Sequence, residues 1–197
     1  MRAGYEAIVS TSHDQIAVTP GYLEREWEQN GRRYFHYKMD EPIWPFVSFL
    51  SADYEMKADS WNDIDIEVYY KHGYNVDRMI DASKKSLDYF TKNFSPYQYR
   101  QYRIFEFPRQ RGSFAQSFPN TIPFSENIGF VADIRDPQIS TQFLLTAHDS
   151  LISGGGTRFR GKRSRRSNDT RNALAIFSPD GYGARIWPSP YAAISKL

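Results

Sequence analysis

The sequence predicts an α+β fold, in which a strand-rich first part is followed by one long amphipathic helix and further strands. Three patterns carry this prediction. Apolar side chains alternate at every second position in several segments before residue 71, they recur every three or four positions over residues 75–94, and a strand-like segment, Y-R-I-F-E-F, lies within Gln101–Phe107. With 197 residues and 16% aromatic side chains, the chain has enough apolar material for a hydrophobic core.

The strand-rich first part rests on period-two alternation over residues 5–10, 33–39 and 63–70. The last of these segments contains I-D-I-E-V-Y, with apolar and polar side chains strictly alternating. A Pro-Gly pair, an Asn-Gly pair and two further prolines place turns or sheet edges between the segments. We therefore expect an antiparallel sheet with one face in solvent.

The helix is predicted from a single apolar stripe that begins next to Asn75 and ends before Ser95-Pro96. Asn75 is expected to cap the first turn, and Asp77 suits the positive end of the helix dipole. The apolar stripe consists of Val76, Met79, Ile80, Ser83, Leu87, Phe90 and Phe94.

After the helix, the pattern predicts a strand over Gln101–Phe107 that Pro108 closes. Two short strands are expected around residues 113–116 and 128–133. A last helix is expected from Asp136, with Ile139, Phe143, Leu144 and Ala147 on one face. We find no internal repeat.

Composition limits the classes of protein to which the chain could belong. It contains no Cys, so disulfides and cysteine-based zinc sites are excluded, and any metal ligands must be His or carboxylates. No apolar run approaches the roughly 18 residues that a membrane span requires, and the first residues lack the core of a signal peptide. The sequence therefore predicts a soluble, cytoplasmic fragment.

Two segments give the chain a resemblance to a known family. They are Y-N-V-D-R-M-I-D-A-S-K-K-S-L-D-Y-F-T-K-N-F-S-P-Y-Q at 74–98 and S-F-A-Q-S-F-P-N-T-I-P-F-S-E at 113–126. On them, residues 1–148 resemble the zinc aminopeptidases of the membrane-alanyl-aminopeptidase type, the gluzincins. The likeness is greatest to the aminopeptidase-like module of bacterial ABC-transporter-associated permeases, so the resemblance implies a parent protein in a bacterial membrane. It also implies the end of a β-rich N-terminal domain (1–71), followed by the truncated start of a thermolysin-like α/β catalytic domain (72–149).

The resemblance assigns a substrate-binding role to Glu126 and Asn127. In the family, a G-x-M-E-N motif lies on an edge strand, its Glu binds the free α-amine of the peptide, and its backbone lines the substrate cleft. Here P-F-S-E-N at 123–127 occupies that place, with the Gly and the Met replaced. A carboxylate suits the task because an α-ammonium needs an opposite charge at a fixed distance from the reacting carbonyl.

The zinc site of the family is only partly present in the sequence. The family carries H-E-x-x-H on a helix and a Glu ligand about twenty residues later. Here His148 matches the first ligand, Asp149 stands at the general-base Glu position, and Ile152 stands where the second His should be. Since a catalytic zinc needs three protein ligands and no His follows residue 148, we expect this chain to bind no zinc and to be inactive.

The tail from residue 150 differs from the rest in charge. Residues 150–197 carry nine Lys and Arg against two Asp, a net charge of +7, in a chain whose net charge is +2. Back-translation of Leu151–Arg158 with permitted codons gives H-Q-W-W-G-H-Q in another frame, which is how the family continues. Later shifted segments give A-N-V-Q-G and S-A-L-M-V-M-E. We therefore interpret the tail as an irregular, out-of-frame sequence, which the codons of Ser153 and Gly154 can decide.

The sequence thus predicts a truncated zinc metalloaminopeptidase-like protein whose parent binds peptide N-termini or removes their first residue. No nucleic acid is expected as a partner. The alternative is a non-catalytic binding protein whose basic tail contacts nucleic acid or an anionic membrane. Nucleic-acid binding with a steep salt dependence would favour the alternative.

Overall fold

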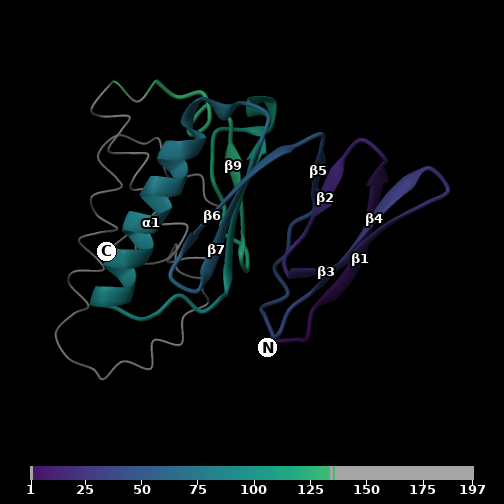
Figure 1. The fold of residues 1–197 in the computed structure, drawn as a ribbon, viewed down its shortest axis with the longest axis horizontal. Helices are drawn as coiled ribbons and strands as arrows, with labels where there is room; N and C mark the ends of the chain where they lie inside the picture. Colours follow the sequence, from purple (N-terminus) through teal and green to yellow (C-terminus); the bar gives the residue numbers. More distant parts are fainter. Residues whose placement is uncertain (1, 134, 136–197) are drawn as a thin grey trace, which may run out of the picture. The chain divides into compact units, whose positions relative to one another are not determined.

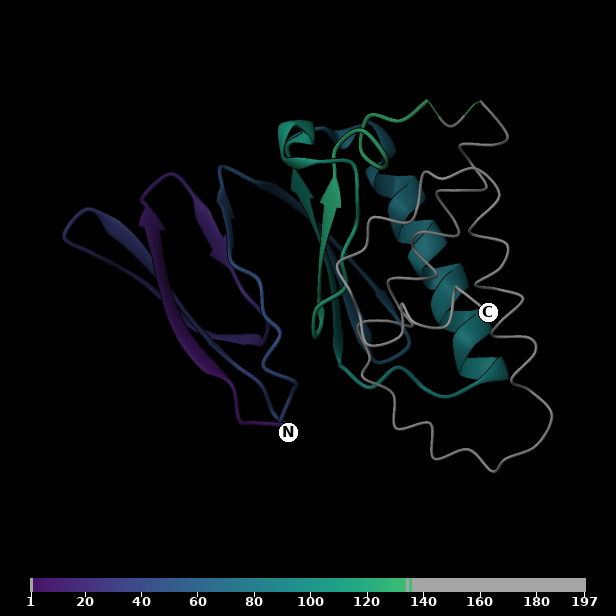
Figure 2. The same cartoon turned by 180° about the vertical axis from the view of Figure 1, so that it is seen from behind.

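The structure is a computed structural model that describes residues 2–133 and residue 135 (Figures 1 and 2). The described residues form a mixed, strand-rich α+β fold with one α-helix, as expected. The elements in chain order are β1 (Glu6–Ser12), β2 (Ile16–Val18), β3 (Tyr22–Gln29), β4 (Arg32–Lys38), β5 (Leu50–Ala52), β6 (Glu55–Trp61), β7 (Ile64–Tyr70), η1 (Gly73–Asn75), α1 (Val76–Asn93), β8 (Gln101–Phe107), η2 (Arg109–Arg111) and β9 (Thr121–Ser125).

The first strands form an antiparallel sheet in the order β1-β4-β3, beside the two-stranded ribbon β2-β5. The predicted strands at 5–10 and 33–39 are confirmed as β1 and β4. Asn30 and Gly31 join β3 to β4 with positive φ angles of 52° and 71°. That conformation matches the twist of a tight hairpin, which is why an Asn-Gly pair stands there.

The second sheet has the order β6-β7-β8-β9, in which β6 and β7 are antiparallel and β7, β8 and β9 run parallel. Helix α1 is the crossover from β7 to β8, since parallel neighbours need a long connection. Its buried residues include Val76, Met79, Ile80, Ser83 and Leu87, so the predicted stripe is confirmed over these positions. The apolar ones pack with side chains of the sheet in one core, and Figures 1 and 2 show α1 lying beside this sheet.

Asn75 is the N-cap residue of α1, as predicted, but its side chain makes no capping hydrogen bond. Instead it is buried, and its Nδ2 donates to the carbonyl oxygens of Gly129 at 2.6 Å and Ala132 at 2.8 Å. Its Oδ1, the atom that would accept a backbone N–H in a cap, accepts from Nη1 of Arg78 at 3.0 Å.

The two short strands predicted near residues 113–116 and 128–133 are wrong. The first segment makes only an isolated bridge at Ala115, and the second lies largely in a turn. The strand in this region is β9, which the apolar pattern did not predict, although the resemblance implied an edge strand at 123–127. Pro123 is tolerated here because β9 is at the edge of its sheet.

Arg103 joins the two sheets. It lies on β8 with 1% of its surface exposed. Its guanidinium donates to the carbonyl oxygens of Thr19 at 3.0 Å and Gly21 at 2.5 Å. Both residues lie in the connection between β2 and β3. Phe105, also on β8, packs in the core that contains Phe35.

Gly129 provides a first prediction about this packing. A Cβ at Gly129 would lie 2.5 Å from Cε1 of buried Phe124 and 3.3 Å from Cε of Met79. We expect Gly129→Ala to lower the free energy of unfolding by about 1–3 kcal/mol, because the ring must shift in a packed core. Urea denaturation measures the change. Gly4→Ala is the control, since nothing lies within 4 Å of its Cβ, and equal losses in the two variants would contradict the prediction.

Candidate functional site

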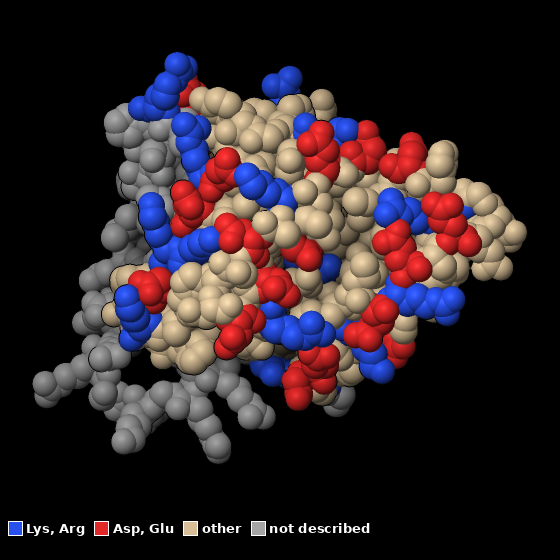
Figure 3. All heavy atoms as spheres, viewed as in Figure 1, with Lys and Arg blue, Asp and Glu red and all other residues tan. Residues whose placement is uncertain are grey.

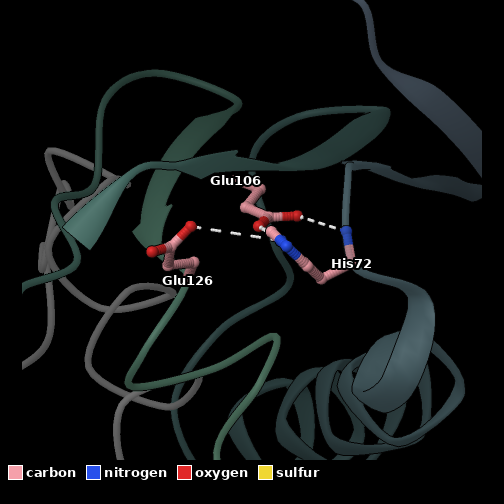
Figure 4. Close-up of side chains that lie close together, drawn as sticks. All are labelled: His72, Glu106 and Glu126. Carbon is pink, nitrogen blue, oxygen red and sulfur yellow. Dashed lines mark hydrogen bonds and ion pairs between the residues drawn. The ribbon is translucent and has the colours of Figure 1, made fainter.

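Three parallel strands bring His72, Glu106 and Glu126 together. His72 follows β7, Glu106 is the penultimate residue of β8, and Glu126 follows β9 directly. Because neighbouring parallel strands end at the same edge of a sheet, residues far apart in sequence meet there. One ligand-type atom from each side chain lies within 4.8 Å of the others (Figure 4). We call these three residues the His–Glu cluster.

Glu106 is the buried member of the His–Glu cluster, with 3% of its side chain exposed. Its Oε2 accepts backbone N–H groups from Lys71 at 2.6 Å and His72 at 2.9 Å. Its Oε1 contacts Nδ1 of His72. A carboxylate removed from water needs such donors, and here two of them are backbone groups that hold the carboxylate in one orientation.

Glu126 lies at the rim of the cluster, with 15% of its side chain exposed. Its Oε2 is 4.0 Å from Nδ1 of His72, and its Oε1 is 3.5 Å from Nε of Arg109. The backbone fixes its position, since its N–H donates to Phe107 and its carbonyl accepts from Val131. His72 is half-exposed, so solvent reaches the imidazole between the two carboxylates (Figure 4).

The outer edge of β9 already has partners. The N–H of Ser125 donates to the carbonyl of Phe114 at 2.9 Å, and the N–H of Gln116 donates to the carbonyl of Pro123 at 3.1 Å. The chain therefore covers the backbone groups through which an extended peptide would add to this strand. A ligand that binds at this edge would therefore contact the side chains at the end of β9.

The structure shows the surroundings of one further predicted site residue. Asn127 lies on the turn after β9, where its amide donates to Oγ of Ser113 at 2.7 Å and accepts from Oγ of Ser125 at 2.6 Å. Its side chain thus holds the turn that carries Glu126. The predicted zinc ligand His148 and its neighbour Asp149 lie outside the described residues.

Sequence reasoning found Glu126 but missed His72 and Glu106. Both stand at the end of a predicted strand segment, which was the available signal. Their meeting depends on β7, β8 and β9 being parallel neighbours, and no local pattern reports that order.

Comparison with solved structures gives a similar fold. The crystal structure of Legionella pneumophila aminopeptidase A in complex with aspartic acid matches with a TM-score of 0.68 and 13% identity. The match covers 77% of this chain and 19% of that one, so the chain spans about a fifth of the length of its structural neighbour. The fold is aminopeptidase-like. The sequence itself matches no protein-family model and no curated protein sequence.

The His–Glu cluster also has a donor set that could hold a metal ion. The cluster lies within residues 2–133 and 135: its three side chains each offer a ligand atom, and these atoms are close enough to share one ion. One imidazole and two carboxylates form a donor set that suits a divalent transition metal.

In the same part of the chain, no helix is both long and apolar enough to cross a bilayer.

Proposed function

We propose that this chain is the part of an aminopeptidase-type module that binds the N-terminus of a peptide without cleaving it. Glu126 is the acceptor for the α-ammonium. The observation that carries the proposal is the position of this carboxylate, fixed at the end of the edge strand β9 in an aminopeptidase-like fold. Arg109 is the competitor for the same carboxylate and is two-thirds exposed, so it can move aside when an ammonium arrives.

The absence of hydrolysis follows from the sequence around His148. Ile152 cannot coordinate a metal, and Asp149 is shorter than the Glu that polarises a zinc-bound water. The proposal includes the division at 71/72 and 149/150, the out-of-frame origin of residues 150–197, and a parent protein in a bacterial membrane that uses zinc. These parts rest on the resemblance in sequence.

Glu126→Gln tests the binding role. We expect the variant to bind a free-amine tripeptide about 10- to 100-fold more weakly, because a hydrogen bond to a charged group contributes about 1.5–3 kcal/mol. Arg109→Ala should bind the same peptide more tightly, since it removes the neighbour 3.5 Å from the carboxylate. Isothermal titration calorimetry measures both affinities.

The N-acetylated tripeptide is the control ligand. It lacks the α-ammonium, so wild type and Glu126→Gln should bind it equally weakly. Equal affinity of the wild type for the free and acetylated peptides would refute the binding role. Release of the aniline from an aminoacyl anilide by the purified chain would refute the non-catalytic reading.

The alternative function, binding of nucleic acid or an anionic membrane through the basic tail, depends on residues outside the described part. The described surface gives it no support on the face shown in Figure 3, where basic and acidic side chains are interspersed. Several of them form ion pairs, such as Lys84 with Asp59 at 2.7 Å. A surface of this kind lacks the one-signed patch that phosphate binding requires.

A further inference from the structure

We propose that the His–Glu cluster binds one divalent transition-metal ion, for which Zn²⁺ is the fitting probe. The ligand atoms are Nδ1 of His72 and one carboxylate oxygen each of Glu106 and Glu126, all within 4.8 Å of one another. The site is separate from His148, on which the expectation of no bound zinc rests. It does not depend on the proposed binding of peptides.

The chemistry of the donors selects the class of metal. One imidazole nitrogen and two carboxylates give three protein ligands, which leaves a fourth position for water or another ligand. Imidazole favours zinc and its neighbours, whereas Mg²⁺ and Ca²⁺ prefer all-oxygen ligand sets. Zinc is therefore expected to bind well ahead of magnesium or calcium.

The distances are compatible with an ion after a small side-chain movement. A tetrahedral zinc with bonds of about 2.1 Å holds its ligand atoms roughly 3.4 Å apart. The present separation of His72 from Glu126 is 4.0 Å, and that of His72 from Glu106 is shorter than the tetrahedral value. A rotation of the half-exposed imidazole toward Glu126 changes both separations in the required direction (Figure 4).

Glu106 provides the fixed part of the site. The N–H groups of Lys71 and His72 occupy its Oε2 and leave Oε1 turned to the imidazole. Outer hydrogen bonds of this kind orient metal ligands and contribute to affinity. Glu126 is the outer ligand, and its other oxygen lies 3.5 Å from Nε of the exposed Arg109.

A simpler state of the same residues is the pairing of His72 with the two carboxylates, with no metal. Calorimetric titration of the chelator-treated 197-residue chain with ZnCl₂ separates the two. We expect one zinc per chain at this site. The affinity for zinc should be at least about tenfold lower in His72→Gln and in Glu126→Gln than in the wild type. The side-chain ¹H–¹⁵N spectrum should show the ring nitrogens of His72 shifting with zinc.

His36→Gln is the matched control, because Nε2 of His36 lies 2.7 Å from Oε1 of Glu6 in another His–carboxylate pair. It should bind zinc like the wild type, and so should His148→Gln. If zinc does not bind at millimolar concentration, the ion pair alone is present and the proposal is overturned. Loss of binding only in His148→Gln would also overturn it.

The two proposals that share Glu126 can fail separately. His72→Gln should lose zinc binding but keep the affinity for a free-amine peptide, whereas Glu126→Gln should lose both. Zinc should also compete with the peptide for the wild type, since one carboxylate cannot hold both cations. Peptide binding that is lost in His72→Gln to the same extent as in Glu126→Gln would overturn this separation.

Discussion

Replacing Arg103 with alanine is expected to lower the free energy of unfolding by about 4 kcal/mol. The guanidinium donates to the carbonyls of Thr19 and Gly21 and also reaches the side chain of Asn120 at 3.3 Å. Each buried acceptor that loses its donor costs about 1–3 kcal/mol. The lost packing over the ring of Tyr37, 5.3 Å from the guanidinium carbon, adds to this. Urea denaturation followed by circular dichroism measures the loss.

Arg103→Lys and Arg33→Ala are the comparisons for this variant. One nitrogen of Arg103, Nη2, donates to all three of these acceptors. A lysine keeps the charge and one nitrogen donor, so its loss should be smaller than that of Arg103→Ala, although it lacks the planar group that packs over Tyr37. Arg33 pairs with Glu26 at the surface, and its removal should cost about 1 kcal/mol or less. If Arg103→Ala were no more costly than Arg33→Ala, the guanidinium would not hold the two sheets together.

Much of the fold could be predicted because the spacing of apolar residues along the chain indicates which segments are strands and which is a helix. β1, β4 and β7 show alternation, and α1 shows a three- and four-residue stripe; each of these patterns records which face of one element is buried. The mistakes fall where distant partners override local preference. Asn75 is of a residue type that commonly caps helices. Its side-chain amide nitrogen instead donates to the carbonyls of Gly129 and Ala132, which are more than fifty residues away.

The candidate site was found only in part for the same reason. Glu126 stands in a recognisable segment, whereas His72 and Glu106 become neighbours through the parallel order β7-β8-β9. Nothing in the local sequence of Glu106 distinguishes it from a solvent-facing strand carboxylate, because its burial comes from the β7 and β9 ends on either side. Its partners are the backbone of Lys71 and His72, and backbone donors leave no signal in the side-chain sequence.

Raising the pH from 10 to 12 is expected to lower the free energy of unfolding by about 2 kcal/mol through Tyr37 alone. Burial raises the pKa of Tyr37 from 10.0 to about 12. Because the pKa of the folded state lies above that of the unfolded state, this stability is fully present below pH 10 and is lost as the pH rises through 12. Burial also raises the pKa of Tyr99 to about 12 and those of Tyr54, Tyr69 and Tyr102 further, so the total loss should be larger.

Tyr37→Phe separates the contribution of this residue. The variant loses the hydrogen bond from the Tyr37 hydroxyl to the carbonyl of Ala17, at 3.1 Å, and should be about 1 kcal/mol less stable at pH 8. Its stability should then fall less steeply between pH 10 and 12, as urea denaturation at each pH will show. Val18→Ala, in the same core, lowers stability without removing an ionisable group, so its curve should run parallel to that of the wild type. A Tyr37→Phe curve that also runs parallel would mean that the ionisation of Tyr37 does not limit alkaline stability.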